Sequence, residues 1–194
     1  MVDADRAPGG LNGPKRRNAP QTKARILTSA QHAFSELGYS QAGIRDIAAL
    51  AGVSSPMLLR YFGSKAGLFE AALIEATRLD RIFEQGRAGF GEHLSRLLVD
   101  VDLDIKAPAM VALSTGDPDA RAIATRVTEK HVIEPLARWL GPPEARARAI
   151  QITMICMGFV TYTRQLPLSP GAKGMDRKLA RWLAGTLQSI VDQP

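Results

Sequence analysis

The sequence is poor in cysteine and has no long apolar run. Its 194 residues include one cysteine, Cys156, which excludes an internal disulfide, and no neighbouring residues have the spacing of a metal site. The longest stretch without a charged residue, 149–163, has 15 residues, whereas a membrane-spanning helix needs about 20 mostly apolar ones. The first 20 residues contain no apolar segment typical of a secretion signal. We therefore expect a cytoplasmic protein without a membrane span.

Patterns typical of enzymes are also missing. The three histidines, His32, His93 and His131, have no carboxylate or cysteine at a spacing that would complete a metal-ligand set. The glycine-rich residues 86–91 lack the ending of a phosphate-binding loop, and residues 38–42 depart from the nucleophile-elbow pattern at their last position. We expect no enzymatic activity and no metal or cofactor.

The positive charge is concentrated near the N-terminus. The whole chain has 25 Lys and Arg against 19 Asp and Glu, a net charge of +6. Residues 15–65 contain eight basic and two acidic residues, so this segment alone carries the full +6. The basic residues are Lys15, Arg16, Arg17, Lys23, Arg25, Arg45, Arg60 and Lys65. This distribution favours a nucleic-acid-binding module joined to a neutral remainder, although a solvated basic face is an alternative.

Apolar residues recur at helical spacing along most of the chain, and no segment alternates as a strand does. The expected helices are 21–37, 44–51, 54–62, 64–83, 92–104, 108–113, 117–140 with a bend at Pro135, 144–166 and 175–191. We expect an all-α protein of about nine helices. Its predicted parts are a disordered basic arm (1–18), a three-helix DNA-binding domain (19–65) and a helical ligand-binding and dimerisation domain (66–194).

The second and third expected helices are joined by a four-residue junction typical of a helix-turn-helix. The junction begins at Gly52, where the sharp turn favours a positive φ, and Ala48 is small enough for the two helices to cross closely. The third helix is short enough to enter a major groove about 12 Å wide. Helical bundles also contain short helices, so a bundle without DNA binding stays an alternative.

Two segments resemble the DNA-binding domain of the TetR family of transcriptional regulators. They are residues 43–54 (GIRDIAALAGVS) and 61–69 (YFGSKAGLF), and the resemblance extends over about 23–73 through the first helix. It implies a homodimer, usually a repressor, that binds a near-palindromic operator in double-stranded DNA. It also implies that a small-molecule ligand in the C-terminal domain releases the operator. That domain resembles the family only in length and helix count.

The chain departs from the family pattern at several positions. Gly43 replaces a common Thr, Leu59 replaces a common Tyr that touches the DNA backbone, and Pro56 and Met57 replace Gly and Thr. These differences leave the operator sequence open. Alternatives are an activator, a regulator without a ligand, and a helical ligand-binding or protein-interaction module that no longer binds DNA.

Eight residues are candidate DNA contacts: Arg45, Ser54, Ser55, Pro56, Met57, Arg60, Tyr61 and Lys65. Arg45 is expected at a phosphate or a guanine edge, and Met57 at a thymine methyl group. Arg60 and Tyr61 are expected at phosphates, as is Lys65 at the start of the fourth helix. Ser54 can also serve as a helix cap. The arm residues Lys15, Arg16 and Arg17 are either further DNA contacts or a solubilising tail, and Ile47, Val53 and Phe62 are expected in the core.

The ligand pocket is predicted from Met and aromatic residues, which suit an adaptable apolar cavity. Its candidate lining residues are Met110, Trp139, Met154, Met157, Phe159 and Tyr162, with His93, His131 and Thr161 as polar anchors. The same residues at helical spacing are equally consistent with simple core. The last two helices are expected, from the resemblance, to form the dimer interface, with Ile150, Gly158, Trp182 and Leu187 as candidates.

Overall fold

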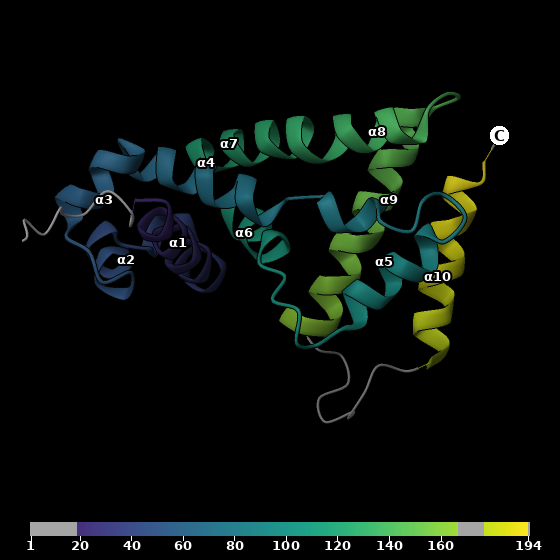
Figure 1. Ribbon diagram of the computed structural model, residues 1–194, viewed down its shortest axis with the longest axis horizontal. Coiled ribbons are helices and arrows are strands. Elements are labelled where there is room, and N and C mark those ends of the chain that lie inside the picture. Colours follow the sequence, from purple (N-terminus) through teal and green to yellow (C-terminus); the bar gives the residue numbers. More distant parts are fainter. Residues whose placement is uncertain (1–18, 167–176, 194) are drawn as a thin grey trace, which may run out of the picture.

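The computed structural model describes residues 19–166 and 177–193, and these residues form helices and connecting loops without a strand (Figure 1). The α-helices are α1 (Ala19–Gln41), α2 (Ile44–Leu50), α3 (Ser55–Phe62), α4 (Lys65–Ala76), α5 (Phe90–Val99), α6 (Ala107–Ser114), α7 (Pro118–Thr128), α8 (Glu134–Leu140), α9 (Ala145–Val160) and α10 (Arg177–Val191). A 3₁₀ turn, η2 (Asp80–Phe83), and two π-helical turns, η3 (Glu129–Ile133) and η4 (Thr161–Gln165), complete the list. The all-α prediction is confirmed.

The expected nine helices correspond to these ten, because α7 and α8 together occupy the predicted helix 117–140. No helix among the described residues has the length and apolar content needed to cross a bilayer. The predicted basic arm, with Lys15, Arg16 and Arg17, lies outside the described residues, as does Met175 at the predicted start of the last helix. The predicted domain limits stay a prediction.

Local signals in the sequence set several of the helix ends. Ser54, Ser64 and Asp117 are N-caps, and each side chain accepts a hydrogen bond from a backbone N–H in the first turn. Gly38 leaves the helical conformation with a φ of 74°, so the regular part of α1 ends where its sequence predicts.

The fourth helix is shorter than its apolar spacing predicts. We expected it to continue to Phe83, but it ends at Ala76, and Thr77 Oγ1 donates to the carbonyl oxygens of Leu73 and Ile74 at 2.9 and 3.1 Å. The chain resumes as the 3₁₀ turn η2. The prediction of one continuous helix was therefore wrong, because spacings of three and four residues are satisfied by a short 3₁₀ turn as well as by an α-helix.

Two other predicted helices differ from the observed ones. Helix α5 covers 90–99 rather than 92–104, because Asp100 is extended (φ −64°, ψ 105°) and its carboxylate accepts a bond from the Asp102 N–H at 3.0 Å. The bend expected at Pro135 takes the form of the π turn η3 immediately before α8. A proline has no N–H and crowds the preceding turn, and the wider π geometry accommodates both effects.

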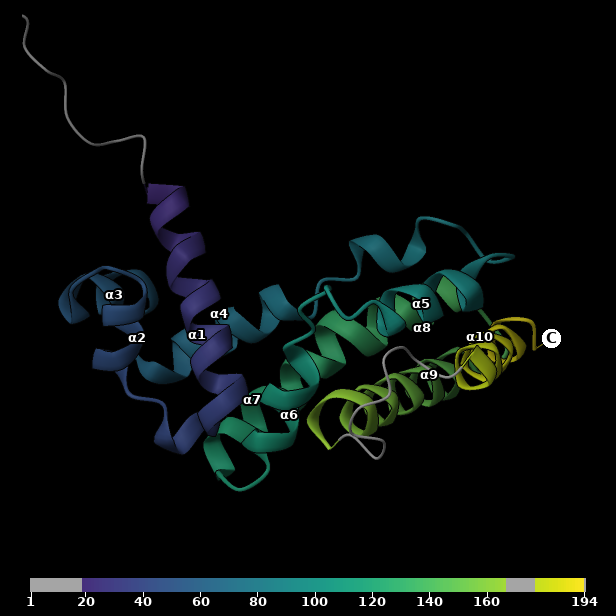
Figure 2. The ribbon, with the colours of Figure 1, turned by 90° about the horizontal axis from the view of Figure 1, so that it is seen from below.

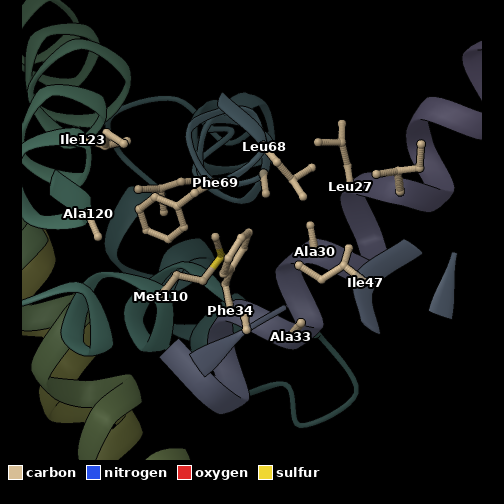
Figure 3. Close-up of a cluster of buried hydrophobic side chains, with 14 of the residues drawn as sticks. Leu27, Ala30, Ala33, Phe34, Ile47, Leu68, Phe69, Met110, Ala120 and Ile123 are labelled. Atoms are coloured by element: carbon tan, nitrogen blue, oxygen red, sulfur yellow. The ribbon is translucent and has the colours of Figure 1, made fainter. Parts of the chain in front are cut away.

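Buried side chains form two hydrophobic clusters. The N-terminal cluster joins α1–α4 to α6 and α7, and Figure 3 shows Met110 of α6 pointing toward Phe34 and Phe69, with Ala120 and Ile123 of α7 beside them. The C-terminal cluster joins α5, α8, α9 and α10. Helix α6 packs along α1, and α7 packs along α4. Helices α1–α4 therefore share their core with α6 and α7.

Two arginines hold the helix ends of the C-terminal cluster together. Arg148 is 1% exposed, and its guanidinium donates to the carbonyl oxygens of Leu140, Gly141, Val191 and Gln193. Arg87 donates to the carbonyls of Trp139, Leu140 and Val191. Because the C-terminal carbonyls of α8 and α10 carry partial negative charge, these two cations stabilise both helix ends at once.

Candidate DNA-binding site

The turn between α2 and α3 has the geometry of a helix-turn-helix. Gly52 has a φ of 63°, as its sequence context predicts, and its N–H donates to the Ala49 carbonyl at 3.0 Å. The Val53 N–H reaches back to the Ala48 carbonyl at 3.0 Å, and Val53 packs against the N-terminal cluster together with the fully buried Ile47. This tight turn fixes α3 across α2.

Helix α3 lies at one end of the molecule, opposite α10 (Figures 1 and 2). Ser54 caps it by accepting a hydrogen bond from the Met57 N–H at 3.3 Å. Within the helix, the side chain of Leu58 is fully buried. Pro56, Met57, Leu59 and Arg60 are exposed, whereas Ser55, Tyr61 and Phe62 are partly buried. The structure thus presents five of the eight candidate contacts on or beside this helix to solvent, namely Arg45, Ser54, Pro56, Met57 and Arg60.

Lys65 is held in place within the chain. Its Nζ donates to the Ser40 carbonyl at 3.2 Å and lies 4.8 Å from the centre of the Tyr39 ring. The lysine therefore connects the start of α4 with the end of α1. A phosphate at this position would have to compete with the Ser40 carbonyl, so the predicted phosphate contact of Lys65 stays a prediction.

The end of α1 also contacts the start of α7. Ser40 Oγ donates to Asp117 Oδ2 at 3.3 Å. Burial raises the pKa of Tyr39 above its ordinary value, and the nearby carboxylates of Asp117 and Asp119 raise it further. The Tyr39 hydroxyl is therefore protonated at neutral pH. The Ser40–Asp117 hydrogen bond joins the end of α1 to the start of α7.

Arg25 is a further basic residue beside the helix-turn-helix that the eight sequence candidates do not include. A guanidinium nitrogen of Arg25 lies 3.9 Å from the position that a Cβ on Gly52 would occupy, so this exposed α1 side chain lies against the helix-turn-helix turn. The sequence showed only its charge. Arg25, Arg45 and Arg60 thus place positive charge on α1, α2 and α3 at the same end of the molecule.

The candidate ligand-lining residues are separated in the structure. Met110 is buried in the N-terminal cluster, whereas Trp139 and Phe159 belong to the C-terminal cluster. Met157 is partly buried, and Met154 and Tyr162 are 67% and 56% exposed. Trp139 packs against the rings of Phe83 and Phe90 at 5.1 and 4.8 Å.

The three predicted polar anchors differ in exposure, and the grooves are lined by other residues. The His93 ring Nε2 is 2.6 Å from the Arg81 carbonyl oxygen, His131 is exposed, and Thr161 is partly buried. A groove of about 600 Å³ lies between η3, α8 and the start of α9, and another of about 520 Å³ lies between α1 and the end of α4. Neither groove is lined by any of the six candidate residues, all of which belong to the part of the chain that the structure describes.

Helices α9 and α10 leave large apolar side chains uncovered in the single chain. Trp182 is 55% exposed, and Ile150 and Gly158 are partly exposed, whereas Leu187 is fully buried. Leu187 therefore contributes to the core of the chain itself. Solvent reaches Ile150, Met154 and Gly158 on α9, Trp182 on α10, and Tyr162 in the π turn η4 that follows α9.

In comparisons with known proteins, two family models match separate parts of the chain. The family model of bacterial regulatory proteins of the tetR family matches residues 26–72, and the model of the tetracyclin repressor-like C-terminal domain matches residues 88–191. Among curated proteins, the HTH-type transcriptional activator FasR of Mycolicibacterium smegmatis is 37% identical over 68 residues. The HTH-type transcriptional regulator RutR of Escherichia coli is 41% identical over 61 residues. These alignments cover 35% and 31% of this chain and only 31% and 29% of the relatives' lengths.

Solved structures match over most of the chain. A TetR-family regulator from Rhodococcus sp. superposes with a TM-score of 0.69 at 18% identity, covering 89% of this chain and all of the other. GusR of Salmonella enterica superposes with a TM-score of 0.67 at 19% identity, covering 93% of this chain and all of the other. At these identities the similarity shows the fold.

A helix-turn-helix with a basic, exposed end on a helical body defines a DNA-binding transcriptional regulator. The chain belongs to the TetR family, as the resemblance in its sequence indicated. The matched family and relatives are transcriptional regulators.

Proposed function

We propose that this protein binds a near-palindromic operator as a homodimer and represses transcription there until a small-molecule ligand releases it. The observation that carries the proposal is the exposed outer face of α3, in a domain whose helices α1, α2 and α3 carry the exposed arginines Arg25, Arg45 and Arg60. Exposed basic side chains neutralise phosphates, and an exposed short helix fits a major groove. A regulator of this kind acts on DNA in the cytoplasm.

The dimer sets the geometry of binding. Two copies of α3 must be about 34–36 Å apart, one helical turn of DNA, to reach both half-sites. The apolar residues uncovered on α9 and α10 support a dimer formed through these helices. Since α6 and α7 share the core of the DNA-binding helices, a ligand that displaces either helix would change the separation of the two α3 helices.

The direction of regulation has two candidates. Repression is the common mode in the family, whereas the printed name of the relative FasR is that of a transcriptional activator. The ligand is proposed to be uncharged and apolar, which the Met and aromatic candidates in the sequence favour, although the structure distributes these candidates over both clusters and the surface. A reporter gene placed behind the operator distinguishes the two modes, because deletion of a repressor raises expression and deletion of an activator lowers it.

Selection of genomic fragments on the purified protein at about 0.15 M salt, followed by sequencing, tests the proposal. Enrichment of a near-palindromic motif supports DNA binding by a two-fold dimer. Retention of fragments without any common sequence would contradict it and favour a helical module that no longer reads DNA.

Arg45→Ala measures how much Arg45, at the start of α2, contributes to the affinity for the operator. If Arg45 contacts a base, operator binding weakens by roughly 1–3 kcal/mol per half-site, as measured by fluorescence anisotropy at fixed salt. Arg121→Ala, at an exposed arginine on α7, is the matched control and leaves the affinity unchanged. Equal affinities of Arg45→Ala and the natural protein would remove Arg45 from the site.

A further inference from the structure

The exposed face of α3 has few groups that hydrogen-bond to DNA bases. Its exposed side chains are Pro56, Met57, Leu59 and Arg60, and only the arginine carries a polar group. Ser54 lies at the cap, where its Oγ accepts the Met57 N–H, and Ser55 is partly buried. Three of the four exposed side chains of α3 are therefore apolar, and the polar Ser55 and Tyr61 are only partly exposed.

Helical geometry explains how these side chains are distributed. Leu58 is fully buried and marks the inner side of α3. Successive residues of an α-helix are rotated by about 100°, so Met57 and Leu59 lie on the two flanks of Leu58 while Pro56 and Arg60 point outward. Met57 is 42% exposed and Leu59 is 38% exposed, so a surface that covers α3 contacts both flanks.

The charge around α3 indicates what covers it. Exposed arginines lie on all three helices of this domain, with Arg25 beside the Gly52 turn, Arg45 on α2 and Arg60 on α3, and such cations match a phosphate backbone. The apolar group that a major groove presents is the C5-methyl of thymine. An apolar helix face with exposed arginines in the same domain is thus complementary to a thymine-rich groove.

We propose that α3 reads its half-site mainly through thymine C5-methyl groups, which Met57 and Leu59 contact, while Arg60 supplies the hydrogen bonds at the end of the helix. This inference rests on the proposed function. Each half-site then contains thymines on both flanks of the position that Pro56 faces. Since 5-methylcytosine carries the same methyl group in the groove, its C5-methyl substitutes for that of thymine at the methyl contact.

Replacement of thymine by deoxyuridine in the selected operator tests the proposal, because it removes one methyl group and changes no hydrogen bond. Titrations with labelled duplexes, each containing one dT→dU change per half-site, measure the Kd. We expect the Kd to rise about fourfold for each contacted methyl group removed, with no change for replacements outside the protected segment.

Variants of the protein assign the methyl groups to side chains. Met57→Ala loses the sensitivity to deoxyuridine at one position of the half-site, and Leu59→Ala loses it at another. Arg60→Ala binds more weakly and keeps both sensitivities. Both apolar residues are exposed, so the variants are expected to melt within a few degrees of the natural protein, which circular dichroism verifies.

The outcomes separate this inference from the function on which it rests. If the natural protein selects an operator and no deoxyuridine replacement changes its Kd, the proposed methyl readout is wrong, while the proposed binding to an operator is still supported. Sensitivity to deoxyuridine that persists unchanged in both Met57→Ala and Leu59→Ala would also overturn the assignment. If the natural protein selects no sequence at all, the proposed function and the methyl readout fail together.

Discussion

Cys156 illustrates how a single side chain depends on its surroundings. It lies on α9 against the C-terminal cluster, and burial raises the pKa of its thiol to about 12. The reactive species is the thiolate, so at pH 8 the folded protein is expected to react with a disulfide reagent at least roughly 100-fold more slowly than the unfolded chain. Absorbance of the released thiol measures both rates. Equal rates before and after addition of denaturant would show that the thiol is accessible.

Gly43 is a second position where a single residue affects the stability of the fold, through the start of helix α2. It is the N-cap of α2 with extended backbone (φ −88°, ψ 140°), and it offers no side chain to the free N–H groups. Gly43→Thr supplies a capping oxygen and reduces the freedom of the unfolded chain, so we expect a gain of roughly 0.5–1 kcal/mol in the free energy of unfolding, measured with urea.

The Asp46 carboxylate can reduce the stability gained by Gly43→Thr. A Cβ on Gly43 would lie 2.5 Å from Asp46 Oδ2, but Asp46 is exposed and its carboxylate can rotate into solvent. Gly43→Ala, which adds the same Cβ without the oxygen, is the control and separates the cap from the backbone effect. A Thr variant less stable than the natural protein would mean that the contact with Asp46 dominates.

Residue-level signals in the sequence were sufficient where the partner lies within a few residues. Ser54, Ser64 and Asp117 cap their helices as serine and aspartate do in isolated turns, and Gly52 adopts the positive φ its turn needs. The burial of Arg148 was not predictable in this way, because its carbonyl partners come from α8 and from the end of α10, about 45 residues away in the chain.

At the scale of elements, the close approach of α5 and α10 depends on Gly91. A Cβ at this position would overlap the Ala184 carbonyl oxygen and lie 2.8 Å from the Gln188 N. The Gln188 side chain also accepts the Gly91 N–H at 2.9 Å. Gly91→Ala is therefore expected to destabilise the fold by about 1–3 kcal/mol, as measured by thermal unfolding.

Gly185→Ala on α10 is the matched control for this contact. Nothing lies within 4 Å of a Cβ at Gly185, and alanine has the higher helix propensity, so this variant gains up to about 1 kcal/mol. Opposite signs for the two variants support packing as the cause. A Gly91→Ala variant as stable as the natural protein would show that α5 and α10 can separate at little cost.

Helix ends were the least predictable feature at this scale. The spacing of Leu79, Ile82 and Phe83 is apolar at intervals of three and four, and it led us to extend α4 to a segment that forms a 3₁₀ turn. What ends α4 is the bonding of Thr77 to its own preceding turn, together with the packing of Ile82 and Phe83 on the C-terminal cluster. Periodicity identifies the buried face without fixing the backbone that presents it.

At the scale of the whole molecule, the two clusters determine how its parts can move. Among the described residues the chain crosses between the clusters three times: from Ala76 to Ile82, back from Ile105 to Ala107, and again from Val127 to Ile133 through the π turn η3. The Arg146–Glu129 ion pair, at 2.9 Å, ties this turn to the start of α9. Sequence reasoning predicted the fold class and the helix-turn-helix. It could not predict that α6 and α7 share a core with α1 and α4, because that depends on contacts between residues far apart in the chain, such as Glu70 with Arg126 (56 residues) and Ser40 with Asp117 (77 residues).

The proposed dimer interface on α9 and α10 can be tested by substituting Trp182. Trp182 is 55% exposed on α10, and a large aromatic side chain uncovered in one chain and buried in a dimer is a common energetic centre of an interface. Trp182→Glu places a charge at that point, so we expect sedimentation equilibrium to show a monomer at concentrations where the natural protein is a dimer. Since one half-site alone is then engaged, operator affinity falls as well.

Val101→Glu is the control for this change, because Val101 is 82% exposed and belongs to the loop after α5 rather than to α9 or α10. It adds the same charge and is expected to leave the dimer and its affinity for the operator intact. If Trp182→Glu sediments as the natural dimer, α10 does not form the interface. The spacing of the two α3 helices would then have to be set by another surface of the chain.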